Sequence, residues 1–203
     1  MALVSNVNNF LGKIGQGVKP NMFEVSIPFP TALGASADDT ELLTFLAKSS
    51  NLPGSTIGSI DVPFRGRTVR IAGDRTFDNW SATFFNDKDM KTRALFEQWM
   101  DNMNTHVGNT APLFTPGGTA NYMKDLEVRQ LEKDGELNGS VIRAYKFWHC
   151  FPTSISQIDL AYDSNDQIEE FTVEFQMSYW TVEAGGKAGI TVGANPPSTT
   201  APA

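Results

Sequence analysis

The chain has 203 residues, of which 40% are hydrophobic and 11% aromatic, enough to bury the core of one ordinary domain. It carries 16 Lys and Arg against 23 Asp and Glu, a formal net charge of −7. This acidic balance argues against a general nucleic-acid-binding protein, which needs basic surface to displace counterions from phosphates. The single cysteine, Cys150, excludes an internal disulfide.

The start of the chain lacks a signal-peptide pattern, because residues 1–10 have neither a basic start nor a continuous apolar stretch. No apolar run approaches the roughly 20 residues that cross a bilayer. We therefore expect a protein without a membrane anchor that is made and stays in a cytoplasm. Composition divides the chain into an N-terminal arm at 1–20, a body at 21–183, and a Gly/Pro/Thr-rich C-terminal arm at 184–203.

The first half of the body predicts strands around one uncertain segment. Residues 22–29 alternate as a strand that Pro28 ends, and 31–39 is a loop of small residues. Residues 40–50 fit either a helix that starts at the acidic segment 38–41 or a strand before the Pro-Gly turn, and the pattern leaves both open. Residues 57–62 and 68–71 predict two strands joined at Gly66, and 80–84 predicts a half-buried strand.

One helix is predicted over about 87–102, capped by Asn86 or Asp87. Its apolar stripe includes Phe96 and Trp99, which we expect to anchor the helix to the core. Strands follow at 126–132 and 141–150, and a last hairpin at 155–162 and 171–179 around the turn 163–166. The fold class is mainly β with one flanking helix.

No catalytic or metal constellation emerges from the sequence. His149 and Cys150 are adjacent on a predicted strand, so their side chains point to opposite faces and Cys150 is expected to be a buried structural residue. The segment from Asp163 resembles a calcium loop but has Ile168 where that loop requires glycine. Two His and one Cys make a zinc site improbable by composition. We expect no enzyme activity and no cofactor.

A dense basic cluster stands apart from the otherwise acidic chain. It consists of four arginines interleaved with aromatic residues: Arg65, Arg67, Arg70 and Arg75. Without further basic surface, a solvated strand face or inter-subunit ion pairs explain this cluster better than nucleic-acid binding.

Several short blocks resemble, in the same order, the tail tube proteins of T4-like contractile-tailed phages. They span about residues 22–182 and are Leu52-Pro-Gly-Ser-Thr-Ile57, Val62-Pro-Phe-Arg-Gly-Arg67, Gly73-Asp-Arg-Thr-Phe77, Trp80-Ser-Ala-Thr-Phe-Phe-Asn-Asp87, Phe96-Glu-Gln-Trp-Met100, Phe151-Pro-Thr-Ser-Ile155, Phe171-Thr-Val-Glu-Phe175 and Tyr179-Trp180. The segments 31–39 and 184–203 look like additions to the family pattern.

The resemblance implies two packed antiparallel sheets in a barrel-like sandwich, with 44–50 as a strand. It implies a structural subunit that forms hexameric rings edge to edge, stacked into a conduit for DNA ejection. Its partners would be itself, a sheath outside, tape measure protein and double-stranded DNA inside, and a baseplate hub and tail terminator at the ends. The segment from Leu52 to Arg67 would reach the next ring, with candidate contacts Leu52, Pro53, Gly54, Arg65 and Arg67.

Related functions share this body and compete with the phage tube. They are the tubes of R-type bacteriocins, extracellular injection systems and type VI secretion, and baseplate proteins that initiate a tube. A sugar-binding sandwich or a hydrolase built on Cys150 are more distant alternatives. The net charge of −7 suits a conduit that must not retain passing DNA.

Overall fold

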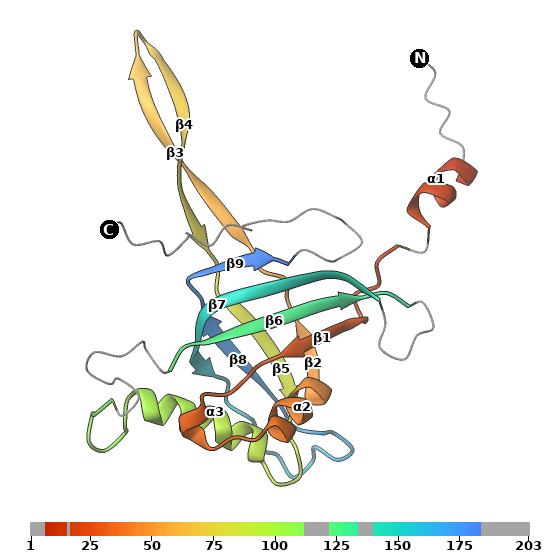
Figure 1. The fold of residues 1–203 in the computed structure, drawn as a ribbon, viewed down its shortest axis with the longest axis vertical. Coiled ribbons are helices and arrows are strands. Elements are labelled where there is room, and N and C mark those ends of the chain that lie inside the picture. The colour runs from red at the N-terminus through yellow and green to blue at the C-terminus, as the bar shows by residue number, and fades with distance from the viewer. Residues whose placement is uncertain (1–6, 16, 112–121, 134–139, 184–203) are drawn as a thin grey trace, which may run out of the picture.

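The computed structural model describes residues 7–15, 17–111, 122–133 and 140–183, so the predicted C-terminal arm lies outside the described residues. Figure 1 shows a β-rich body with helices at one end and a long hairpin projecting from the other. The elements are α1 (Val7–Ile14), β1 (Phe23–Ser26), a 3-10 turn (Thr31–Leu33), α2 (Ala37–Leu46), β2 (Ala47–Ser50), β3 (Ser55–Phe64), β4 (Arg67–Phe77), β5 (Trp80–Phe85), α3 (Lys91–Met103), β6 (Lys124–Leu131), β7 (Val141–Ile155), β8 (Glu170–Gln176) and β9 (Tyr179–Val182).

Seven strands form one antiparallel sheet in the order β1-β6-β7-β8-β5-β2, with β9 also paired to β7. The long strand β7 pairs with β6 and β9 through its first part and with β8 through its end. The register between β6 and β7 shifts beside Cys150, and His149 has φ 56°, as expected for a bulge that bends a strand. The sheet therefore folds into two layers, which confirms the predicted sandwich.

The barrel-like closure is not completed by the described part of the chain. β1 and β2 are the two ends of the hydrogen-bonded path and are not paired with each other there. β3 and β4 form a separate two-stranded sheet. Among the described residues, no helix is both long and apolar enough to cross a bilayer.

Aromatic side chains fill the space between the layers. Along β5 and β8, inward and outward residues alternate as the period-2 pattern predicts, and Trp80 lies opposite Phe175 while Phe84 lies opposite Phe171. From α3, Phe96 packs against the rings of Phe84, Phe171 and Phe175. The fully buried aromatic residues are Trp80, Phe84, Phe96, Trp99, Phe147, Phe171 and Phe175.

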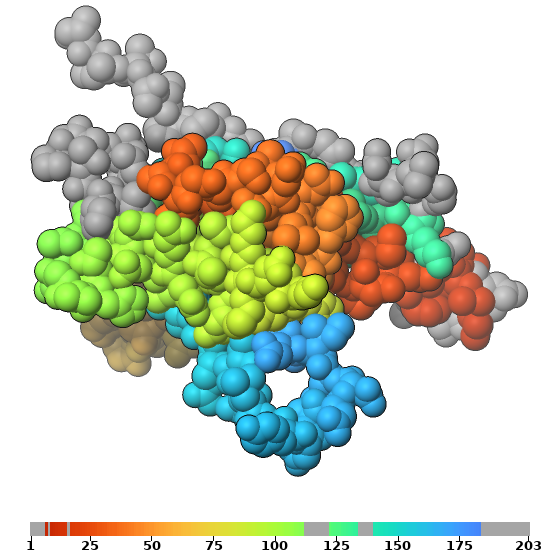
Figure 2. Space-filling model, turned by 90° about the horizontal axis from the view of Figure 1, so that it is seen from below, coloured from red at the N-terminus to blue at the C-terminus, as the bar shows by residue number. Residues whose placement is uncertain are grey.

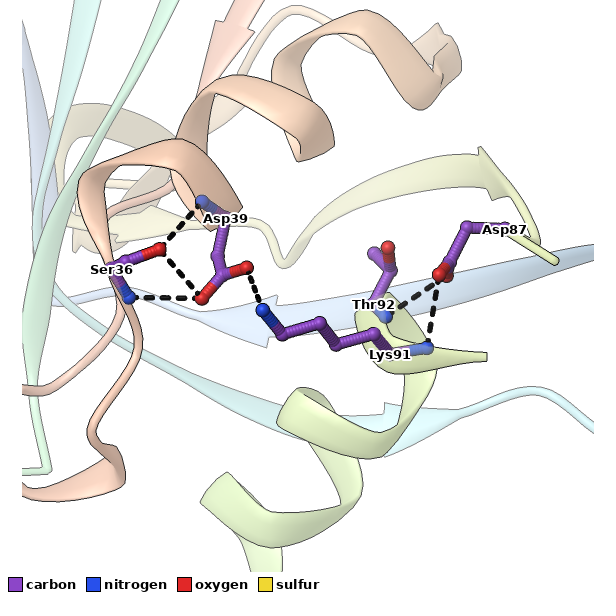
Figure 3. Close-up of polar contacts among 5 residues, drawn as sticks. All are labelled: Ser36, Asp39, Asp87, Lys91 and Thr92. Atoms are coloured by element: carbon purple, nitrogen blue, oxygen red, sulfur yellow. Dashed lines mark hydrogen bonds and ion pairs between the residues drawn. The ribbon is translucent and has the colours of Figure 1, made fainter. Parts of the chain in front are cut away.

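α3 begins at Lys91, four residues later than predicted. Residues 87–90 form a turn in which the amide of Met90 donates to the carbonyl of Asp87 at 3.0 Å. The carboxylate of Asp87 nevertheless accepts hydrogen bonds from the amides of Lys91 (3.1 Å) and Thr92 (3.0 Å), as Figure 3 shows. Asp87 therefore satisfies two free amides of the helix start from outside the first turn.

The uncertain segment 40–50 contains both predicted elements in succession. α2 begins after Ser36, whose side chain and that of Asp39 form a capping box, and ends at Leu46; β2 follows directly at Ala47. The expected loop at 31–39 is wrong in its second part, because α2 already starts at Ala37. The strand that the resemblance placed at 44–50 begins three residues too early for the same reason.

Two further expectations need correction. The N-terminal arm contains α1, so the described chain has three α-helices rather than one. The last hairpin is shorter than predicted, since β7 ends at Ile155 and residues 156–169 form a loop rather than a strand. β7 pairs with β8 as far as Ile155 opposite Val173, and beyond the hydrogen bond from the Ser156 amide to the Thr172 carbonyl the pairing ends.

Candidate assembly surfaces

The β3–β4 hairpin is exposed along nearly its whole length, and it points away from the end that carries α2 and α3 (Figure 1). Its tight turn follows from sequence: Arg65 has φ 47° and Gly66 has φ 81°, the pair of positive values that a two-residue hairpin turn requires. Glycine adopts such a value without steric cost, which explains its place here. The predicted pair of strands joined at Gly66 is confirmed.

One face of the hairpin is an uncovered apolar surface. Ile60 lies opposite Ile71 and Val62 lies opposite Val69, so these four side chains share a face with Phe64. Their exposed fractions run from 39% for Val62 to 62% for Phe64. A two-stranded ribbon with an uncovered apolar face is only marginally stable alone, so this face favours contact with another surface.

The base of the hairpin is fixed to the body. The indole Nε1 of Trp180 donates to the carbonyl of Gly54 at 3.2 Å, and the ring of Phe77 meets that of Trp180 edge to face at 6.3 Å. A side chain at Gly54 would place its Cβ 2.5 Å from a carboxylate oxygen of Asp78, so the backbone passes close to its neighbour there. The hairpin therefore leaves the body in a set direction.

The five candidate inter-ring residues fall into two separate groups. Leu52, Pro53 and Gly54 lie at the base of the hairpin, whereas Arg65 and Arg67 lie at its tip, beyond the ten residues of β3. A strand of ten residues spans roughly 33 Å. The structure does not bring the two groups together, so they cannot form one contact patch.

The basic cluster lies along this hairpin. The guanidinium of Arg70 is 3.4 Å from the carboxylate of Asp61 across the strand pair, and that of Arg65 lies over the ring of Phe64 at 5.4 Å. Arg67 and Arg75 form no ion pair within the part of the chain that the structure describes. The hairpin thus presents positive charge beside its apolar face.

The main sheet offers further surfaces through its edges. β1 and β2 end the hydrogen-bonded path, and β9 pairs on one side only, with β7. Unpaired backbone groups on such strands can pair with another chain. These edges are therefore the second set of candidate assembly surfaces.

The structure places the predicted helix anchors and the cysteine in the core. Phe96 and Trp99 are both 0% exposed, and the indole Nε1 of Trp99 donates to the carbonyl of Tyr122 at 2.8 Å. Cys150 is buried, and this burial raises the pKa of its thiol to about 12. His149 is exposed on the neighbouring position. Within the described ranges, no three His, Cys, Asp or Glu side chains are grouped as metal ligands.

Comparison with known proteins finds relatives along nearly the whole body. The model of a family described as "Phage tail tube protein" matches residues 18–183. Tail tube protein gp19 of Enterobacteria phage T4 is 33% identical over 166 residues, which cover 82% of this chain and 92% of the relative. A tail tube protein of Serratia phage KSP90 is 27% identical over 176 residues, covering 85% of this chain and 94% of that relative.

Solved structures show a similar fold. A chain of the sheath-tube complex of the extracellular contractile injection system PVC, in the extended state, has a TM-score of 0.53 at 14% identity, covering 88% of this chain and 99% of that one. A chain of the PVC sheath/tube terminator has a TM-score of 0.55 at 16% identity, covering 82% and 96%. At these identities the similarity concerns the fold alone.

Proposed function

The chain belongs to the phage tail tube protein family and is a structural tube subunit, and we propose that it forms hexameric rings through its sheet edges and stacks them through the β3–β4 hairpin. The observation that supports the stacking role is the hairpin itself, which projects from the body with its apolar face uncovered (Figure 1). The family points to a non-enzymatic role.

Ring formation follows from the state of the sheet edges. β1, β2 and β9 each have one unpaired side within the described chain, and pairing them between neighbours would satisfy their backbone groups. An interface between two different edges closes into a ring when its rotation matches a whole number of subunits. The number six comes from the family resemblance.

Stacking requires a contact along the tube axis. The hairpin carries four arginines against two aspartates, together with exposed apolar residues. Covering its apolar face with a subunit of the next ring would remove from water the side chains that the single chain leaves exposed. Arg65 and Arg67, at the hairpin tip, would then contact a subunit of the next ring. Leu52, Pro53 and Gly54 would lie where the hairpin joins the body of its own subunit.

The resulting tube would be the conduit for DNA ejection in the virion tail. Its neighbours would be a sheath outside, a tape measure protein and double-stranded DNA inside, and a baseplate hub and tail terminator at the ends. The net charge of −7 supports passage of DNA without retention, because like charges repel.

The alternative is a tube of a phage-derived injection system. The solved neighbours include such systems, but at 14–16% identity, whereas the T4 tail tube protein is 33% identical to this chain. The balance favours a phage tail tube. A sugar-binding surface finds less support, since Trp80 and Trp99 are fully buried.

Electron microscopy of the purified full chain tests this function. Wild-type protein should form rings of six subunits and stacked tubes in negative stain. A variant with the polar substitutions Val62→Thr and Val69→Thr should form rings that stack poorly, because it changes only the exposed face of the hairpin. A wild-type protein that remains a monodisperse monomer at high concentration would contradict the proposal.

A further inference from the structure

The loop 156–169, which replaces the predicted strand, lies at the end of the molecule opposite the hairpin tip (Figure 1). Figure 2 views that end and shows the loop framing an opening at the edge of the body, where Lys48 of β2 and Phe85 of β5 line the same hollow. The hollow measures about 1050 Å³, and its lining includes Phe85, Ile158 and Leu160. Ile158 packs against the core, but the loop beyond it extends away from the body. A loop of this length favours a function in contact with another molecule.

The loop is acidic. Between Ser156 and Glu170 the sequence contains five Asp and Glu and no Lys or Arg. Glu170 pairs with Lys48, and Glu169 accepts a hydrogen bond from the side-chain amide of Asn86 at 3.1 Å. The other three, Asp159, Asp163 and Asp166, are exposed and form no ion pair within the described ranges. The loop therefore presents uncompensated negative charge.

The loop also exposes apolar side chains. Leu160 is 80% exposed, Tyr162 108% and Ile168 70%, and all three line the hollow. Three large apolar residues on one surface loop beside unpaired carboxylates form an amphipathic surface suited to an amphipathic partner.

The hairpin tip has the complementary composition. Phe64 is 62% exposed at the last position of β3, Arg65 stacks on its ring, and Arg67 follows across the turn without an ion pair in the described chain. One end of the chain thus offers an aromatic ring flanked by guanidinium groups, and the other offers a hollow with a mixed polar and apolar lining beside exposed carboxylates.

We propose that the tip of the β3–β4 hairpin of one subunit docks into the hollow of the 156–169 loop of a second copy in the next ring. Phe64 contacts the apolar lining, and Arg65 and Arg67 face Asp159 and Asp163. This pairing rests on the proposed tube function and adds to it the surface that receives the hairpin.

The positions of the two surfaces explain how the assembly grows. They are different surfaces at opposite ends of the long axis, so their contact is head to tail and leaves the hairpins of one end ring and the loops of the other end ring free on every stack. Such a contact extends without limit in one direction, whereas the sheet edges close a ring. One chain can therefore supply both the ring and the growing tube.

Charge reversal tests the pairing in the full chain. The loop variant carries Asp159→Lys and Asp163→Lys, and Asp166 is kept because its φ of 61° suits Asp better than Lys. The hairpin variant carries Arg65→Asp and Arg67→Glu, with Asp at position 65 because it tolerates the φ of 47° found there. The matched control carries Asp38→Lys and Glu41→Lys, two exposed acids on α2 at the same end of the molecule.

We expect both the loop and the hairpin variant to form rings but to need a roughly tenfold or higher protein concentration to form tubes, from the loss of two exposed charge pairs. The control should form tubes as the wild type does. A mixture of the loop and hairpin variants should form tubes again, because each reversed hairpin can meet a reversed loop. The measurements are tube length by electron microscopy and the pelleted fraction by ultracentrifugation.

The outcomes separate this pairing from the proposed function. Normal tubes from the loop variant would overturn the pairing and leave the tube function intact, and lost binding of a sheath protein by that variant would then assign the loop to the outer surface. Equal loss of tubes by the control would also overturn it, since the charge of the whole end would then matter. If the wild type forms neither rings nor tubes, the proposed function fails first.

Discussion

The ammonium group of Lys91 binds the carboxylate of Asp39, which ties the first residue of α3 to the first turn of α2 (Figure 3). Asp39 is 8% exposed and also accepts hydrogen bonds from the amide and the hydroxyl of Ser36 at 2.9 and 3.0 Å. One carboxylate therefore caps α2 and positions α3. The two helices pack beside the core as a connected pair.

Acid should destabilise the fold through these helix starts. The hydrogen bond from Lys91, followed by that from the Ser36 amide, lowers the pKa of Asp39. Burial acts to raise the pKa of Asp87, but hydrogen bonds from the amide and side chain of Thr92 and from the amide of Lys91 together outweigh it, so the pKa is lowered. A carboxylate with a depressed folded-state pKa stabilises the fold above its ordinary pKa and loses this contribution as the pH falls through the folded value. We expect the free energy of unfolding by urea to be level between about pH 7 and 5 and to fall below about pH 4.

Substitutions at Asp39 and its neighbours test whether this carboxylate causes the loss of stability at low pH. Asp39→Asn should lower stability at pH 7 and flatten the decline below about pH 4, since no carboxylate remains there to be protonated. Ser36→Ala should cost about 1 kcal/mol through the lost helix cap but should keep much of the decline. The control Asp38→Asn changes an exposed neighbour and should retain the wild-type profile. An unchanged profile for Asp39→Asn would refute the assignment.

Two phenylalanines on helices, Phe96 and Phe45, should differ strongly in their contribution to stability because only one of them is buried. Phe96 is 0% exposed and contacts four aromatic rings, whereas Phe45 on α2 is 75% exposed. Phe96→Ala leaves a cavity and should cost about 3–5 kcal/mol. Phe45→Ala should change stability by less than about 0.5 kcal/mol. Urea unfolding followed by circular dichroism measures both free energies of unfolding. Similar losses for the two variants would contradict the burial of Phe96 and the exposure of Phe45.

The thiol of Cys150 should be inert in the folded protein. It is 1% exposed, and burial raises its pKa to about 12, so almost none of the reactive thiolate is present at neutral pH. We expect iodoacetamide to modify Cys150 only as fast as the chain unfolds, with full reaction in urea, as measured by mass spectrometry. Cys150→Ala should form rings and tubes as the wild type does. Rapid alkylation of native protein would revive a reactive role for this residue.

The sequence predicts best where a single physical rule decides the structure. β5 and β8 have one buried face each, so the alternation around Trp80 and Phe175 reveals both strands. The β3–β4 hairpin follows from Gly66, whose positive φ matches the turn. Phe96 and Trp99 follow from helical periodicity, although α3 starts later than predicted because the residues after Asp87 form a turn first.

The sequence predicts the structure poorly where contacts with residues distant in the chain determine it. Ile158, Leu160 and Tyr162 alternate as strand residues do, but the pairing of β7 with β8 ends at Ile155 opposite Val173, and these residues form a loop. The hollow framed by this loop depends on where that pairing ends, which the alternation of residues 158–162 does not reveal. The capping box of α2 was missed because the acidic run after Ala37 offers several candidate caps, and only the structure shows that Ser36 is the one used.

The N-terminal arm provides the last prediction. On α1 the apolar residues Val7, Phe10, Leu11 and Ile14 recur at helical spacing and are 49–69% exposed. A helix of eight residues is not stable alone in water, so this stripe favours contact with a neighbouring subunit. The chain is attached to the body at Lys19, because the carbonyl of this residue accepts a hydrogen bond from the side-chain amide of Gln130 at 2.8 Å.

Deleting residues 1–17 should therefore leave the urea midpoint of the single chain unchanged and weaken stacking of its rings. The double variant Phe10→Ser and Leu11→Ser should reproduce the stacking defect, because it removes the centre of the apolar stripe and keeps the chain length. The control Asn9→Ser and Lys13→Gln changes polar residues of the same helix and should stack normally. Tube length in electron micrographs measures stacking, and the urea midpoint measures the stability of the single chain. A lower midpoint for the truncated chain would contradict the prediction, because only a segment packed on the body can stabilise it.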